Sequence, residues 1–288
     1  MGSWSESRGQ NRTLQILGSA AREEYGVLAV VCYNIEHLTA VVRAAESKRS
    51  PLILLLFPST VTQLPTLVWA AAAAVKSATV PMSLHLDHAQ DEAQIREVAA
   101  TLPFDSIMVD MSHHDHGDNL AKTKVLADLC HEHGIAVEAE SGRINGGEDG
   151  IADTGSLEAL FTTPEEVEEF IAADVDLLAP SIGNIHGDYG PSGPQLDYQR
   201  LADVNAQIAG RVGMALHGTN DFTPEIMKRC IQSGTVKLNV NKLVLECWNT
   251  YLREHVHEPL MKLMDGGMAV LQDEVERWMD ICGSSGKA

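Results

Sequence analysis

The sequence predicts an α/β protein made of one domain, a single (β/α)8 barrel with additional helices at both ends. Eight short apolar runs occur at even spacing along the 288 residues, and a helix-forming segment follows each of them. Continuous apolar runs are typical of parallel strands that are buried on both faces. No linker or change in composition divides residues 1–288. The predicted strands cover residues 27–33, 51–57, 82–86, 106–112, 136–140, 176–182, 212–216 and 236–240.

Local signals support these elements in chain order. Residues 1–11 are polar and are expected to be disordered. Asn11 or Thr13 caps a first helix that runs to Tyr25, and Gly26 then opens the first strand. A capping box with Pro at the first helical position, at 163–166, starts the helix after strand five. The other predicted helices lie at 36–47, 62–76, around 95–102, 118–133, 197–208 and 223–234, with a helical extension over 242–281.

The topology has one structural alternative, a doubly wound open sheet. Both folds alternate strands with helices, and both bury a parallel sheet between helical layers. Eight evenly spaced strand-helix units favour closure of the sheet into a barrel.

Composition excludes several classes of protein. A formal charge of −19 argues against a nucleic-acid-binding surface. The five Cys residues include no CxxC pair, so neither a disulfide framework nor a thiolate zinc site is expected. The apolar segment 67–75 has half the length of a membrane span, and residues 1–6 lack the features of a signal peptide. We therefore expect a cytoplasmic protein with no membrane partner.

Three histidines follow predicted strands. His88 comes after strand three beside Asp87, His186 lies in the loop after strand six, and His217 follows strand seven. If the strands are parallel neighbours, the three imidazoles converge on one face. Three neutral nitrogens with an open fourth position form the ligand set of a catalytic zinc ion.

Other polar side chains also lie at or just beyond the carboxyl ends of the predicted strands. This is the edge at which a (β/α)8 barrel places its active site. The strands were identified from apolar runs, so the position of these residues is independent support for a site. Besides the three histidines, they are Asn34, Asp87, Asp110, Glu140 and Asn239.

Seven short stretches resemble the class II, metal-dependent ketose-bisphosphate aldolases, nearest to the fructose/tagatose-bisphosphate branch. They span almost the whole chain, in the order and at the spacing of that family. The stretches are Leu-Asp-His-Ala at 86–89, Val-Glu-Ala-Glu at 137–140, Glu-Asp-Gly at 148–150, His-Gly-Asp-Tyr at 186–189, Leu-His-Gly at 216–218, Lys-Leu-Asn-Val at 237–240 and Ile-Cys-Gly-Ser at 281–284.

The resemblance implies a TIM-barrel lyase that cleaves a ketose bisphosphate to dihydroxyacetone phosphate and an aldehyde, as in glycolysis. It implies that His88, His186 and His217 bind Zn²⁺ or another divalent ion, and we also expect a monovalent cation. Asp87 then handles the proton of the aldehyde or hydroxyl group, and Glu148 removes the proton from the ketone substrate. The residues expected to bind the sugar phosphate are Asn34, Gly187, Gly218, Asn220, Asn239 and Lys242.

Two further expectations concern the surroundings of this site. Asp110 and Glu140 are candidates for orienting the imidazoles or for an alternate metal site. The chain is also expected to form a homodimer or homotetramer through its helical tail. The interface residues expected there are Leu260, Leu263, Met264 and Trp278.

The chain departs from the family pattern mainly where the family binds phosphate. Asn220 and Lys242 stand where relatives have Ser or Thr, Phe57 ends the second strand, and Lys287 replaces a usual final Arg. Two alternatives therefore stay open. One is an aldolase with an altered or non-phosphorylated substrate, and the other is a non-catalytic barrel that binds metal.

Some of these residues have simpler interpretations. Asp87 could cap the helix after strand three, and Glu148 could belong to a solvated acidic loop. The cluster His113–His116 resembles a metal site in composition, but we expect it to lie exposed before a helix. A hydrolase that uses zinc-bound water is a weaker alternative, because it needs a general base directed at water.

Overall fold

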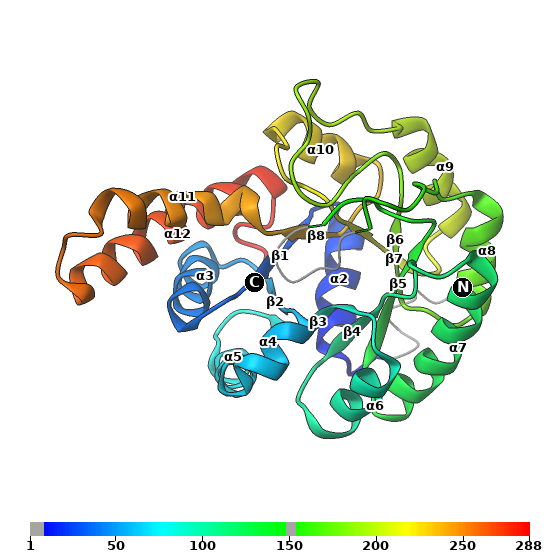
Figure 1. Cartoon of the computed structure of the whole chain (residues 1–288), viewed down its shortest axis with the longest axis horizontal. Helices are drawn as coiled ribbons and strands as arrows, with labels where there is room; N and C mark the ends of the chain where they lie inside the picture. The colour runs from blue at the N-terminus through cyan, green and yellow to red at the C-terminus, as the bar shows by residue number, and fades with distance from the viewer. Residues whose placement is uncertain (1–8, 148–153) are drawn as a thin grey trace.

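The parallel strands close into a barrel in the computed structural model, which describes residues 9–147 and 154–288 (Figure 1). Eight strands occur within this described part, in the order β1 to β8, and β8 pairs with β1 to close the sheet. The predicted (β/α)8 barrel is confirmed. The strands are β1 (Val27–Val31), β2 (Leu52–Leu56), β3 (Met82–Ala89), β4 (Ser106–Val109), β5 (Ala136–Ser141), β6 (Leu177–Pro180), β7 (Gly213–Leu216) and β8 (Lys237–Val240).

Helices surround the barrel, and two extend from it. Helix α2 (Arg12–Glu23) precedes the first strand, while α11 (Lys242–His255) and α12 (Leu260–Cys282) form the hairpin that projects to one side in Figure 1. The α12 helix packs against α3 and α11. The outer helices are α3 (Ile35–Lys48), α4 (Pro58–Gln63), α5 (Pro65–Ser77), α6 (Glu92–Thr101), α7 (His116–Glu132), α8 (Pro164–Ala172), α9 (Tyr198–Ile208) and α10 (Pro224–Gln232).

Proline residues account for the two largest differences from the predicted helices. The single helix expected over 62–76 is two helices, because Pro65 starts α5 directly after Leu64. The single helical tail expected over 242–281 is interrupted before Pro259, which takes the N-cap position of α12. Within that tail Trp278 is 1% exposed, so it packs inside the chain and was wrongly expected at an interface, whereas Leu260 is 69% exposed.

Two apolar layers hold the barrel together. The outer layer lies between the sheet and the surrounding helices, and it contains residues such as Leu54 and Leu84. The inner layer fills the lower half of the barrel, where Leu14 and Leu17 of α2 pack among residues of the strands. Helix α2 therefore closes the amino-terminal end of the barrel, opposite the end where strand-end side chains gather.

The upper half of the barrel interior is polar. On β3, β5 and β8 the side chains alternate, so that Leu84, Val137 and Leu238 join the outer apolar layer while their neighbours face inward. These inward side chains are fully or almost fully buried, so each needs a partner inside the barrel. They are Ser83, His85 and Asp87 of β3, Glu138 and Glu140 of β5, and Lys237 and Asn239 of β8.

None of the helices in the described part of the chain has both the length and the apolar character needed to cross a membrane.

Replacing Leu54 by Ala tests the assignment of the outer layer as core. Leu54 lies on β2 with no exposed surface, and truncation of a buried Leu costs about 2–5 kcal/mol in the free energy of unfolding. Urea unfolding should show this loss for Leu54→Ala, while Val125→Ala, at a side chain that is 54% exposed, changes stability by less than about 1 kcal/mol. Equal effects of the two substitutions would contradict the assignment.

Candidate metal centre

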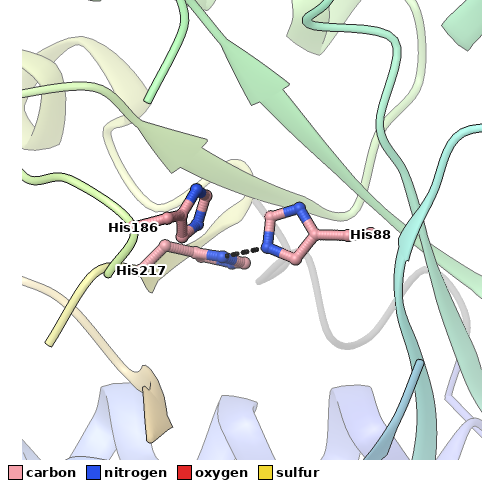
Figure 2. Close-up of side chains that lie close together, drawn as sticks. All are labelled: His88, His186 and His217. Atoms are coloured by element: carbon pink, nitrogen blue, oxygen red, sulfur yellow. Dashed lines mark hydrogen bonds between the residues drawn. The ribbon is translucent and has the colours of Figure 1, made fainter. Parts of the chain in front are cut away.

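The three strand-end histidines lie together at the carboxyl end of the barrel. His88 is the penultimate residue of β3, His186 is in the loop after β6, and His217 directly follows β7. All three side chains are buried, and their ligand nitrogens lie within 4.8 Å of one another. Figure 2 shows His88 facing His217, with 3.0 Å between Nε2 of His88 and Nδ1 of His217. The structure thus brings together the three residues that the sequence singles out as metal ligands.

Unusual backbone conformations direct these imidazoles. The backbone of His88 is left-handed with φ of 48°, at a point where the pairing of β3 with β4 shifts register. A non-glycine residue in this region costs on the order of 1–3 kcal/mol, which the surrounding structure must offset. A Cβ on Gly218, beside His217, would lie 2.3 Å from the carbonyl oxygen of Ile185. The loop that carries His186 can therefore approach His217 only because residue 218 is glycine.

Buried carboxylates fix the orientation of two of the imidazoles. Nδ1 of His88 lies 2.9 Å from Asp110, and Nε2 of His217 lies 2.7 Å from Glu138. Each contact leaves the other ring nitrogen directed toward the centre of the cluster. Nε2 of His186 is buried and has no hydrogen-bond partner among the described residues. A divalent cation fits this donor set, because metal-bound histidines usually donate their second N–H to a carboxylate.

The charges within the cluster favour a mixture of protonation states. Burial lowers the pKa of His88, but Asp87 and Asp110 outweigh it and raise the pKa to about 9. Burial, followed by electrostatic repulsion from the neighbouring His88 and His217 rings, holds the pKa of His186 well below its usual value. At neutral pH the ring of His88 is therefore positively charged, whereas the ring of His186 is neutral and keeps a free lone pair. A bound cation would take the place of that proton.

Glu140 lies behind His88 and is the least acidic carboxyl group near the site. Burial and the charge of Asp110 raise its pKa to about 8. Its Oε1 atom accepts a hydrogen bond from the backbone of Ile144 at 2.8 Å, while Oε2 is buried without a hydrogen-bond partner among the described residues. His88, Asp110 and Glu140 form a second group that could hold a metal ion.

A buried lysine connects the histidine cluster to Asp87. Nζ of Lys237 lies 2.8 Å from Glu138 and donates a 2.7 Å hydrogen bond to Oδ1 of Asn239. The Asn239 amide then donates to both carboxylate oxygens of Asp87, at 3.0 and 2.9 Å. Burial alone would raise the pKa of Asp87, but His88, His85 and Lys237 hold it well below its usual value. Asp87 is therefore ionised.

Our interpretation of the sequence did not single out three residues of this network, His85, Glu138 and Lys237. None of them lies at the carboxyl end of its strand, so a search of the carboxyl ends missed them. A signal was present, because polar residues occupy every second position of 83–87, 138–140 and 237–239. In a barrel strand this alternation indicates side chains that point into the interior.

The remaining predicted residues lie above the cluster. Asn34 caps α3 by accepting a 2.7 Å hydrogen bond from the backbone of His37. Asn220 donates to the carbonyl oxygen of Gly187 at 3.0 Å, and Lys242, the first residue of α11, forms an ion pair with Asp188. Glu148 lies outside the described residues.

A cavity of about 590 Å³ lies beside the histidine cluster. Lys242 and Asn34 line it, and it shares Asn220 and Asn241 with the pocket that contains the three histidines. A ligand at the histidines can therefore extend into this cavity.

Two alternative interpretations of single residues are settled by the structure. Asp91, and not Asp87, caps α6, since its side chain accepts from the backbone of Ala93 and Gln94. His116 opens α7 and contacts Glu169, and the His113–His116 cluster is absent from the metal-capable groups of the described residues.

Lys287 lies at the opposite end of the barrel from the histidines. Its Nζ lies 2.8 Å from Glu23, at the end of the α2 helix that closes the amino-terminal side. The basic residue that replaces the family's final Arg is therefore remote from the site.

Replacing Asp110 by Asn tests its role in orienting His88. Loss of the carboxylate that holds Nδ1 of His88 should weaken zinc binding by about 10–100-fold, as is typical for partners of metal ligands. Competition with a chromophoric chelator measures the affinity. Asp128→Asn, at a side chain that is 59% exposed on α7, serves as the matched control. Equal zinc affinity of the two variants would contradict this role.

The overall fold has close counterparts among solved structures. A crystal structure of a protein from Coccidioides immitis, provisionally named a fructose-1,6-bisphosphate aldolase, matches with a TM-score of 0.95 and 46% identity, over 97% of this chain and 98% of that one. The YdjI aldolase from Escherichia coli K12 matches with a TM-score of 0.83 and 26% identity, over 95% of this chain and 97% of that one.

Sequence comparison leads to the same group of proteins. A fructose-bisphosphate aldolase of Coccidioides immitis (strain RS), likewise named provisionally, is 46% identical over 287 residues, which cover 96% of this chain and 95% of the relative. The family model described as fructose-bisphosphate aldolase class-II matches residues 11–287. The chain therefore belongs to the class II fructose-bisphosphate aldolase family.

Proposed function

We propose that this protein is a zinc-dependent aldolase. It reversibly cleaves a ketose phosphate, such as fructose or tagatose 1,6-bisphosphate, to dihydroxyacetone phosphate and an aldehyde. The observation that carries the proposal is the convergence of His88, His186 and His217 at the mouth of the barrel, beside the ionised carboxylate of Asp87. When bound there, zinc would act as a Lewis acid that stabilises negative charge on the ketone oxygen, an effect worth several kcal/mol.

Residues of the chain account for the proton transfers. In the cleavage direction Asp87 accepts the proton of the C4 hydroxyl group, the C3–C4 bond breaks, and the aldehyde leaves. The electron pair of that bond stays with the ketone half as an enediolate, which takes up a proton at carbon to give dihydroxyacetone phosphate. The family resemblance assigns this last proton transfer to Glu148. Asn239 holds Asp87 through two hydrogen bonds and so fixes the position of the proton acceptor.

The amino-terminus of α11 supports binding of one phosphate group. No side chain of the described residues caps this helix, and its first residues, Asn241 and Lys242, line the cavity next to the histidines. Helix amino-termini bind phosphate through their first backbone N–H groups. Gly187 and Asn220 line the same cavity.

Removal of the metal should abolish turnover. Dialysis against a chelator is expected to eliminate retro-aldol cleavage of fructose 1,6-bisphosphate or a related ketose phosphate, and added Zn²⁺ should restore it. A coupled assay for dihydroxyacetone phosphate measures both steps. Full activity of the metal-free protein would refute zinc dependence.

Replacing Asp87 by Asn separates catalysis from metal binding. The amide cannot accept the hydroxyl proton, so kcat should fall by about 10²–10⁴-fold, while the zinc content measured by atomic emission stays at the wild-type level. Asp128→Asn provides the control for loss of an exposed carboxylate. A metal-loaded wild-type protein that neither cleaves any ketose phosphate nor exchanges the α-proton of dihydroxyacetone phosphate would favour the non-catalytic alternative.

We also propose that the chain assembles as a homo-oligomer. Val256, Leu260 and Met261, at the turn between α11 and α12, are 73%, 69% and 72% exposed, which is unusual for a cluster of large apolar side chains. Light scattering should show a dimer or tetramer that Leu260→Glu weakens, and a monomeric wild-type protein would contradict this assembly.

A further inference from the structure

The cavity next to the histidine cluster has room for the far end of a bound substrate. It is bounded by the start of α3 and by α11, and it adjoins the histidine pocket through Asn220 and Asn241. With the ketone end at the histidines and its phosphate at the amino-terminus of α11, the aldehyde-derived carbons extend into the remaining volume. The chemistry of this cavity therefore selects the aldehyde.

Acidic groups outnumber basic groups on the cavity walls. Among the described lining residues the one cation is Lys242, and its ammonium group is already bound to the carboxylate of Asp188. Glu246 adds a second carboxylate to the wall, and it is ion-paired with Arg253 at 2.7 Å. A second phosphate, carrying almost two negative charges, would have to compete with Asp188 for Lys242 and with Glu246 for Arg253.

The other described cations near the site are also engaged: Arg253 is paired with Glu246. Arg143 donates hydrogen bonds to the backbone carbonyls of Ser112, His114 and Glu158. Lys237 is enclosed within the barrel. Lys287 lies at the opposite end of the barrel, beside Glu23.

Aromatic and neutral polar groups form the rest of the wall. The ring of His37 contacts that of Trp248 edge-on at 4.7 Å between centroids, and Tyr33 lies at 6.1 Å. His37 is 5% exposed, and neither of its ring nitrogens has a hydrogen-bond partner among the described residues. Burial lowers the pKa of His37 to about 4, so the imidazole is neutral at pH 7. A neutral ring and aromatic surfaces suit a hydroxylated, uncharged carbon chain.

From these walls we propose that the aldehyde product is uncharged, and that the natural ketose carries a single phosphate, on its dihydroxyacetone half. This inference rests on the proposed aldolase function and specifies its substrate class. The bond that breaks and the proton transfers are those already described. The specificity-determining residues are Asp188, which neutralises Lys242, together with His37 and Trp248.

Condensation assays test this specificity with the phosphorylated donor held constant. Zinc-loaded protein is given dihydroxyacetone phosphate with either D-glyceraldehyde or D-glyceraldehyde 3-phosphate, which differ only in the second phosphate. We expect kcat/KM for D-glyceraldehyde to be at least tenfold higher. Exchange of the donor's α-proton with deuterated water, followed by NMR, reports the first half of the reaction independently of any aldehyde.

Two variants connect the preference to the proposed residues. Asp188→Asn removes one carboxylate and releases Lys242, so the ratio of kcat/KM values should shift at least tenfold toward the phosphorylated aldehyde. Asp203→Asn, an exposed acid on α9, should leave the ratio within twofold. His37→Leu should raise KM for D-glyceraldehyde about fivefold without slowing proton exchange.

The outcomes distinguish this inference from the function on which it rests. Proton exchange combined with a preference for D-glyceraldehyde 3-phosphate contradicts the inference alone, and so does exchange without turnover of either aldehyde. Absence of both exchange and condensation contradicts the aldolase proposal itself. An unchanged ratio in Asp188→Asn would show that the cavity charge does not set specificity.

Discussion

The buried ion pair between Lys237 and Glu138 is the interaction on which the arrangement of the site depends. Glu138 holds His217, and Lys237 holds Asn239, which in turn holds Asp87. Burial would raise the pKa of Glu138, but Lys237 and the hydrogen bond from His217 lower it to about 2. Breaking a buried pair by removing one partner typically costs about 3–5 kcal/mol. One lysine therefore connects His217 and Asp87, the proposed metal ligand and proton acceptor, which come from different parts of the barrel.

The barrel fold could be predicted because its strands are short and mostly apolar, and because each is followed by a helix. The predicted helix boundaries were wrong where a single proline, Pro65 or Pro259, interrupts an otherwise continuous helical pattern. The convergence of His88, His186 and His217 was also predictable, because parallel strands place their carboxyl ends on one edge. The ion pair between Lys237 and Glu138 was not predictable, because it joins strands that are far apart in the sequence across the interior of the barrel.

Charge distribution separates the two halves of the site. Around the histidines, a cluster of buried carboxylates faces imidazoles and favours a divalent cation. Above it, the wall of His37, Tyr33 and Trp248 is neutral, and Lys242 is compensated by Asp188. The histidine cluster would bind the metal of the proposed reaction, whereas the neutral wall would contact the aldehyde.

The proposed chemistry depends most directly on one zinc ion bound by the three histidines. A crystal structure of zinc-loaded protein, with anomalous data collected on both sides of the zinc absorption edge, tests it. We predict an anomalous peak at about 2.0–2.1 Å from one nitrogen each of His88, His186 and His217. A peak elsewhere, or imidazoles turned away from one another with no metal between them, would contradict the account.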